Sequence, residues 1–110
     1  MHDTGTEWPL YSTRGQDPAA EESIQAFVVS LAERIDGLQD ADSRGEHALL
    51  AELAQTLTED ADRQGFGVLA RCAEVVVMDL RDSDAAGAHK HLVELTRIAR
   101  RVRLGHAGSM

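Results

Sequence analysis

Apolar residues recur every three or four positions along most of the chain, which is the period of an α-helix with one buried side. Asp17 and Pro18 stand directly before the first such stretch. A carboxylate can accept the free amide hydrogens of a first turn, and proline fits the first helical position. The pattern therefore predicts a helix over about residues 18–41, with inward positions Ile24, Phe27, Val28, Leu31, Ile35 and Leu38.

Three further segments show the same period. The run from Ser43 to Glu46 has the form of a capping box and predicts that a second helix starts there. Gly65 should end it in a left-handed conformation, with Phe66 packing back on the last turn. A third helix is expected over about residues 67–82, and Asp84 should cap a fourth. The inward positions are Leu49, Leu50, Leu53, Leu57 and Ala61, then Val68, Leu69, Cys72, Val76 and Leu80, then Ala88, Leu92, Leu95, Ala99 and Val102.

These elements predict the fold class. The β-branched run Val75–Val77 lies inside a longer helical period, so we interpret it as helix. Four amphipathic helices joined by short turns can bury their apolar sides only against one another, which predicts an all-α, antiparallel up-and-down four-helix bundle. The 110 residues are enough for one domain. We assign residues 17–104 to the bundle, residues 1–16 to a partly flexible N-terminal segment and residues 105–110 to a C-terminal tail.

The net charge of the chain limits the kinds of molecule that it can bind. The net charge of −8 opposes nucleic acid, and a basic protein surface is an easier match. The negative charge is concentrated in residues 1–62, which hold 14 acidic and 3 basic side chains. The later basic cluster either complements a helix C-terminus and acidic neighbours or forms a binding stripe. It comprises Arg97, Arg100, Arg101 and Arg103.

Cysteine use and hydropathy indicate the compartment. Cys72 is the only cysteine, so an intrachain disulfide is impossible and a reducing, cytoplasmic setting is expected. No apolar run approaches the roughly 20 residues that a membrane span needs.

For the oligomeric state, we expect a monomer or a weak dimer.

Signatures of enzyme chemistry are missing from the sequence. There is no glycine-rich phosphate loop, nucleophile elbow or HExxH motif. His89 and His91 lie about 200° apart on a helix, so their rings cannot share an ion, and we interpret both as solvated or interhelical. Cys72 lies on an inward stripe, where a thiolate is poorly solvated. We therefore expect no cofactor, no metal and no catalytic activity.

Several segments, in this order and spacing, resemble the histidine-containing phosphotransfer (HPt) domain of bacterial phosphorelays. The resemblance covers about residues 9–104. It is carried by Pro9-Leu10-Tyr11-Ser12, Phe27-Val28-x-x-Leu31-x-x-Arg34-Ile35, Ala54-x-x-Leu57, Gly65-Phe66-x-x-Leu69 and Arg100-Arg101-Val102-Arg103. The resemblance implies a four-helix bundle that exchanges phosphoryl groups with response-regulator receiver domains.

The chain departs from that family at the reactive position. Counting back from Gly65, Gln55 stands where the family has its phospho-accepting histidine, while Thr58 and Glu59 stand where it has lysine and glycine. The lone pair of a carboxamide nitrogen is tied up in resonance, whereas a neutral imidazole nitrogen has a free one. Gln55 should therefore not accept a phosphoryl group.

The surroundings of Gln55 should be acidic. Helical spacing places five residues on one solvent-facing side, which the resemblance marks as the binding surface for a receiver domain or a histidine kinase. They are Glu52, Gln55, Thr58, Glu59 and Asp62. Any exposed helical stripe in an acidic protein can look like this, so a purely solvated face is the alternative.

Three functional hypotheses follow. The first is an HPt-like signalling module that binds a receiver domain or kinase without passing on a phosphoryl group. The second is phosphotransfer through another histidine, of which His47 is the closest to Gln55 in sequence, about 12 Å along the helix. The third is a structural or oligomerising bundle outside any phosphorelay.

Overall fold

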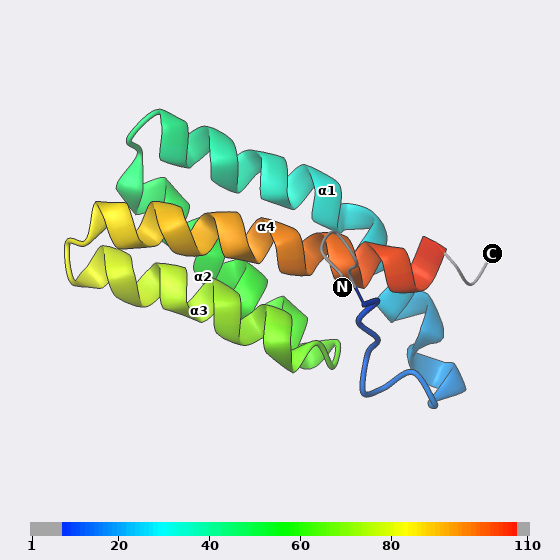
Figure 1. The fold of residues 1–110 in the computed structure, drawn as a ribbon. Helices are drawn as coiled ribbons and strands as arrows, with labels where there is room; N and C mark the ends of the chain where they lie inside the picture. The colour runs from blue at the N-terminus through cyan, green and yellow to red at the C-terminus, as the bar shows by residue number, and fades with distance from the viewer. Residues whose placement is uncertain (1–7, 108–110) are drawn as a thin grey trace, which may run out of the picture.

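The computed structural model describes residues 8–107, and among these residues it contains helices and no strand. The all-α prediction is confirmed, and the valine run is helical. Figure 1 shows the elements, which are a short 3-10 helix η1 (Pro18–Ala20) and the four α-helices α1 (Glu21–Ser43), α2 (His47–Arg63), α3 (Gly67–Arg81) and α4 (Ala85–Ala107).

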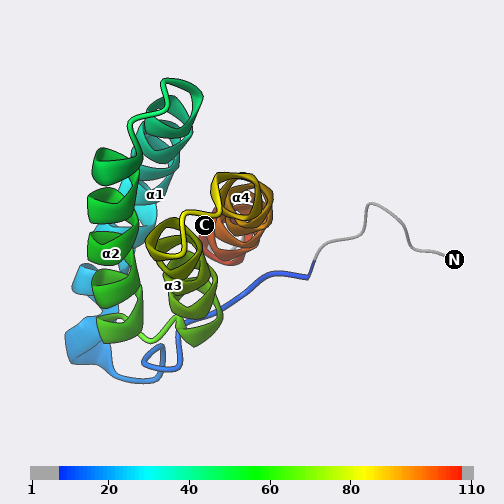
Figure 2. The ribbon, with the colours of Figure 1, turned by 90° about the vertical axis from the view of Figure 1, so that its left-hand side faces the viewer.

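The four helices lie side by side, in an arrangement consistent with a helical bundle. α2 packs between α1 and α3, and α4 packs on both α3 and α1. The α1–α2 and α3–α4 turns lie at one end of the molecule, and the α2–α3 turn lies toward the other (Figure 1). Seen along the helices, α2 has one side that faces away from the other three (Figure 2).

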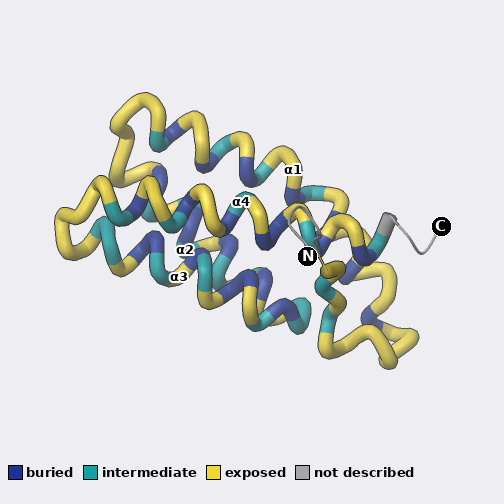
Figure 3. Tube along the Cα trace, in the orientation of Figure 1, coloured by how far each residue is buried: buried dark blue, intermediate teal, exposed yellow. Residues whose placement is uncertain are grey.

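The core consists of aliphatic side chains with two phenylalanines, and no polar residue among those described is buried. All the inward positions predicted for α1 and α4 are buried, and the buried stretches of Figure 3 follow the inner side of each helix. Leu53, Cys72 and Leu80 are only partly buried and pack against the core. The largest fully buried side chains are Leu31, Leu38, Leu50, Leu57, Leu69 and Leu95.

Two predicted core positions were wrong. Leu49 is 41% exposed and Val68 is 42% exposed. Each immediately precedes a buried leucine, Leu50 and Leu69 respectively, and neighbouring helical residues point about 100° apart. At both places the leucine takes the core-facing position, so the residue before it lies toward solvent.

The three interhelical turns share one helix-ending motif. Gly45, Gly65 and Ser83 have positive φ of 69°, 84° and 59°. The amide of the residue after each one donates to a carbonyl five residues earlier, as in the bond from Phe66 N to Ala61 O at 2.9 Å. This is the Schellman pattern, which satisfies the last carbonyls of a helix. The predicted left-handed end at Gly65 is confirmed.

The predicted capping box at Ser43 was wrong. Ser43 is the last residue of α1, its hydroxyl donates to Asp40 O at 3.0 Å, and α2 begins only at His47. The reason is Gly45: its left-handed backbone ends α1, and a residue in that conformation cannot lie in the first turn of a helix. The other two predicted caps are confirmed, since Asp17 Oδ1 accepts from Ala19 N at 3.0 Å and Asp84 Oδ1 accepts from Gly87 N at 2.9 Å.

The segment before η1 is tied to the end of the molecule that holds the α2–α3 turn. Leu10 N donates to Arg101 O and Thr13 N donates to Gly65 O, both at 3.0 Å. At the other terminus α4 continues to Ala107, so residues 105–107 of the expected tail are helical. The rest of the predicted flexible segment and tail, residues 1–7 and 108–110, lies outside the described residues. Within residues 8–107, every helix is too short or too polar to cross a membrane.

Candidate functional site

The five residues predicted to form one surface do so on α2. Glu52, Glu59 and Asp62 are exposed, while Gln55 and Thr58 are half-buried at its edge. We call this set, Glu52, Gln55, Thr58, Glu59 and Asp62, the acidic face. It occupies the side of α2 opposite the buried residues Leu50, Ala54, Leu57 and Ala61.

Gln55 is the middle residue of α2, and its amide is directed along the helix. Its Nε2 donates a hydrogen bond to Glu59 Oε2 at 3.0 Å. One turn of helix separates the two residues, which is the spacing at which side chains on one helix meet. A carboxylate is thus held directly beside the position at which the resemblance implies a reactive nitrogen.

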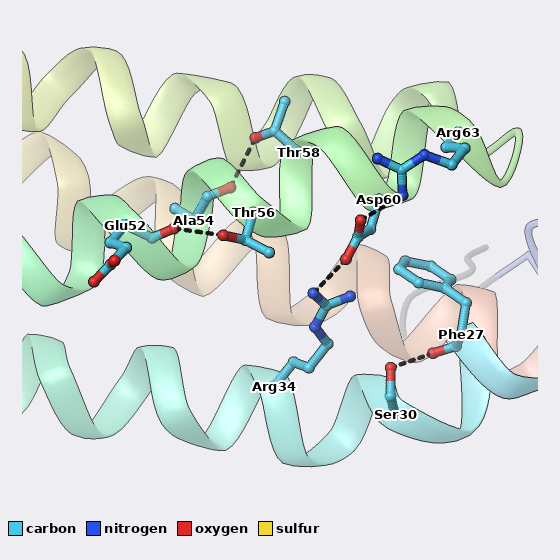
Figure 4. Close-up of polar contacts among 9 residues, drawn as sticks. All are labelled: Phe27, Ser30, Arg34, Glu52, Ala54, Thr56, Thr58, Asp60 and Arg63. Atoms are coloured by element: carbon cyan, nitrogen blue, oxygen red, sulfur yellow. Dashed lines mark hydrogen bonds and ion pairs between the residues drawn. The ribbon is translucent and has the colours of Figure 1, made fainter.

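The hydroxyl groups of this region are bonded to their own helix. Thr58 Oγ1 donates to Ala54 O at 2.8 Å, and Thr56 Oγ1 donates to Glu52 O at 3.1 Å (Figure 4). Neither hydroxyl brings positive charge to the acidic face. A phosphoryl group at Gln55 would therefore meet the Glu59 carboxylate in place of a cation.

Next to the acidic face is an ion-paired group that the sequence analysis missed. Arg34 on α1 places its Nη2 2.6 Å from Asp60 Oδ2, and Arg63 places its Nη1 2.7 Å from Asp60 Oδ1 (Figure 4). Hydrogen bonding from Arg34 lowers the pKa of the Asp60 carboxyl, assisted by Arg63 and the charges of both, while burial opposes them. The sequence feature that pointed to this group is Arg34 itself, a charged residue between the apolar positions Leu31 and Ile35 of the first helix.

Arg34 also contacts the core. Its guanidinium carbon lies 5.7 Å from the centroid of the Phe27 ring, and that ring stacks on Phe66 with centroids 5.7 Å apart. Phe66 in turn meets the ring of His106 at 5.9 Å. These contacts connect α1, α4 and the α2–α3 turn beneath the C-terminal half of α2.

The histidines of α4 take part in contacts between helices. His89 Nδ1 lies 2.6 Å from Asp42 Oδ2 of α1, and His91 Nδ1 lies 2.5 Å from Asp79 Oδ2 of α3. The interhelical interpretation is confirmed for both, although their carboxylate partners were not foreseen. Among residues 8–107 no group of three or more histidine, cysteine or carboxylate side chains is placed to hold a metal ion.

His47 and Cys72 were the other candidates for chemistry. His47 is the exposed first residue of α2, far along the helix from Gln55. Cys72 is a free, half-buried thiol, and burial raises its pKa, helped by the nearby Glu94 and opposed by Arg71. A thiol with a raised pKa is a poor nucleophile at neutral pH.

No protein-family model, curated protein or solved structure matches this chain. Its distinctive surface features are the acidic face and the Arg34–Asp60–Arg63 group. Together they form a surface of α2 that carries the exposed carboxylates of Glu52, Glu59 and Asp62, with Gln55 at its edge and the ion-paired Arg34, Asp60 and Arg63 beside it.

Proposed function

We propose that this protein is an HPt-like signalling module, an antiparallel four-helix bundle that binds a receiver domain or a histidine kinase of a bacterial phosphorelay without accepting a phosphoryl group. The observation that carries the proposal is the placement of Gln55 on the outer side of α2, bonded to Glu59. The segments that resemble the HPt family supply the link to phosphorelays.

The chemistry of the position supports an inactive module. The Gln55 nitrogen has no available lone pair, so it cannot form a stable bond to phosphorus. A like charge at about 4–6 Å from a phosphoryl group costs roughly 1–3 kcal/mol at a partly exposed site, and Glu59 supplies such a charge. The missing nucleophile at Gln55 and the negative charge of Glu59 thus both oppose acceptance of a phosphoryl group.

The acidic face supports binding by charge. Three exposed carboxylates, those of Glu52, Glu59 and Asp62, lie within three turns of one helix. A partner with basic side chains around its docking surface would be attracted and oriented by them, mostly through a faster association rate. Such a module would act by occupancy: a receiver or kinase bound to it is withheld from an active phosphotransfer partner.

Titration of fluorescently labelled protein with the receiver domains and kinases encoded near it tests the proposal. We expect saturable binding that weakens as salt rises. The double variant Glu52→Lys and Asp62→Lys should abolish it, whereas the matched double variant Glu22→Lys and Asp82→Lys, on exposed positions of α1 and the α3–α4 turn, should bind as the wild type does.

Two results would overturn the proposal. One is the absence of binding to every neighbouring receiver and kinase. The other is a self-association whose interface covers Gln55, which would indicate the structural or oligomerising bundle instead.

A further inference from the structure

The junction between α1 and α4 is hollowed along the surface. One hollow of about 390 Å³ is lined on the α1 side by Val28, Val29 and Ala32 and on the α4 side by Arg100, Arg103 and Leu104. A second, of about 660 Å³, lies nearer the α1–α2 turn and includes Val93 and Thr96 of α4. Gln39 Nε2 bridges α1 to Thr96 Oγ1 at 3.2 Å within this second hollow. We call the two hollows together the α1–α4 groove.

Apolar side chains in the groove are unusually exposed. Val29 is 69% exposed, Val93 is 52% exposed and Leu104 is 43% exposed. Single exposed aliphatic residues are common on protein surfaces, but a row of them along one junction between helices is typical of an interaction site. Val29 and Leu104 line the smaller hollow and Val93 lines the larger one, so one helix lying along α1 and α4 would contact all three.

The charge of the groove is uneven. No carboxylate is among the described residues that line the smaller hollow, which include Arg100, Arg103 and His106. Arg103 is exposed and lies one turn before Ala107, where α4 ends. At the larger hollow, Asp42 is already paired with His89. The smaller hollow therefore combines apolar side chains with positive charge at Arg103, and the larger hollow combines the apolar Leu92 and Val93 with polar side chains such as Gln39 and Thr96.

We propose that the α1–α4 groove binds an amphipathic helix of a partner protein, one whose apolar stripe is flanked by aspartate or glutamate at the end that meets Arg103. An apolar stripe would cover Val29, Val93 and Leu104, and the carboxylates would form ion pairs with the exposed Arg103. The groove shares no residue with the acidic face on α2. This second surface would let the protein hold two partners at once and act as an adaptor, whichever partner the acidic face takes.

A synthetic peptide tests the groove directly. The probe is an amphipathic helix of about 18 residues with leucine at helical spacing and glutamate on both flanks of the stripe. The comparison peptide has the same stripe with lysine in place of glutamate. We expect the glutamate peptide to bind, by fluorescence anisotropy, and to shift the backbone amide resonances of residues around Val29 and Leu104. The lysine peptide should bind at least about tenfold more weakly.

Matched variants keep the test specific. Val29→Asp and Arg103→Glu should each weaken binding of the glutamate peptide by about tenfold or more. Met78→Asp and Arg81→Glu, which change another exposed apolar residue and an exposed arginine on α3, should leave binding unchanged. Circular dichroism verifies that all four variants are folded.

Three outcomes would overturn the proposal. The first is no binding of the glutamate peptide, and the second is equal binding of the two peptides. The third is a dimer of the protein, seen by sedimentation, that Val29→Asp converts to monomer, because a second copy would then be the occupant of the groove.

Discussion

The guanidinium of Arg34 and the carboxylate of Asp60 face each other across the contact between α1 and α2, with nitrogen and oxygen 2.6 Å apart. Both side chains are less than a third exposed, so water screens this pair less than a fully solvated one. Arg63 approaches the second carboxylate oxygen from within α2. Asp60 thus carries two cationic partners and holds α2 against α1 next to the acidic face.

Removal of the Asp60 charge should destabilise the protein in a pH-dependent way. The folded-state pKa of Asp60 is below its ordinary value of 3.8, so its contribution is complete above that value and is lost as pH falls through the folded-state pKa. Asp60→Asn should lower the free energy of unfolding by about 1 kcal/mol at neutral pH. Urea titrations at a series of pH values should measure the free energy of unfolding of both proteins. The difference between variant and wild type should shrink only as the pH falls below 3.8.

Arg44→Ala is the matched control for this pair. Arg44 and Asp40 form an ion pair at 3.4 Å within one helix, and both side chains are more than half exposed. Solvated pairs of this kind contribute little, so the variant should change the unfolding free energy by less than about 0.5 kcal/mol. An equal effect of Asp60→Asn and Arg44→Ala would show that the Arg34 contact adds nothing.

Gly65 should tolerate a side chain much less well than Gly45. Both have positive φ, which costs an alanine about 1 kcal/mol. A Cβ at Gly45 would meet nothing within 4 Å, whereas at Gly65 it would lie 2.6 Å from Ser12 Oγ and 3.0 Å from Thr13 N. Gly65→Ala should therefore lower the free energy of unfolding by roughly 2–3 kcal/mol. Gly45→Ala should lose only the part that comes from the positive φ.

The difference between the two glycine variants measures how firmly the segment before η1 is attached. Thermal or urea unfolding of both variants gives that difference. If Gly45→Ala and Gly65→Ala lost the same stability, the segment around Ser12 would yield to the new Cβ at no cost, and its bonds to Gln64 O and Gly65 O would contribute little to the fold.

The sequence pattern predicted the helices because each carries a long apolar stripe that only a 3.6-residue period can bury on one side. It failed at Ser43, where a capping box and a glycine helix end compete for the same four residues. Local spacing does not decide between them; in the structure Gly45 takes the left-handed conformation, so α1 ends at Ser43 and α2 begins at His47. The pattern was also wrong at Leu49. Either of two adjacent leucines can face the core by spacing alone, and in the structure Leu50 is buried while Leu49 is exposed.

The candidate site was predictable where it depends on one helix and was missed where it depends on two. The acidic face follows from helical spacing within α2. Arg34 and Asp60 are 26 residues apart in sequence, and nothing in the sequence indicates which carboxylate an arginine on another helix will reach. His89 and Asp42 were missed for the same reason, because their pairing is a product of the bundle's packing.

Cys72 should react slowly with thiol reagents in the folded protein. Burial and Glu94 raise the pKa of its thiol above the ordinary value of 9.0, so the thiolate fraction at pH 7–8 is smaller than in an unfolded chain. We expect reaction with 5,5′-dithiobis(2-nitrobenzoic acid) to be at least about tenfold slower in buffer than in concentrated urea. A folded-state rate equal to the rate in urea would show that the thiol is open to solvent and unperturbed.

Restoring the missing groups should restore phosphoryl acceptance if the scaffold is that of an HPt domain. The triple variant Gln55→His, Thr58→Lys and Glu59→Gly supplies an imidazole, a cation and open space, and it removes the carboxylate that now bonds Gln55. The glycine should cost the helix about 1 kcal/mol, so circular dichroism is needed to establish that α2 persists. Incubation with a phosphorylated receiver domain should then give an acid-labile phosphate on the variant and none on the wild type.

Two comparisons decide what this experiment means. The single variant Gln55→His should accept phosphate more slowly than the triple variant, because Glu59 still repels the phosphoryl oxygens. A folded triple variant that stays inert would show that α2 no longer presents position 55 to a receiver, which contradicts the HPt-like docking mode. If the wild type accepts phosphate and His47→Ala does not, the phosphorylated residue is His47, the first residue of α2. His47 is the histidine nearest in sequence to the acidic face.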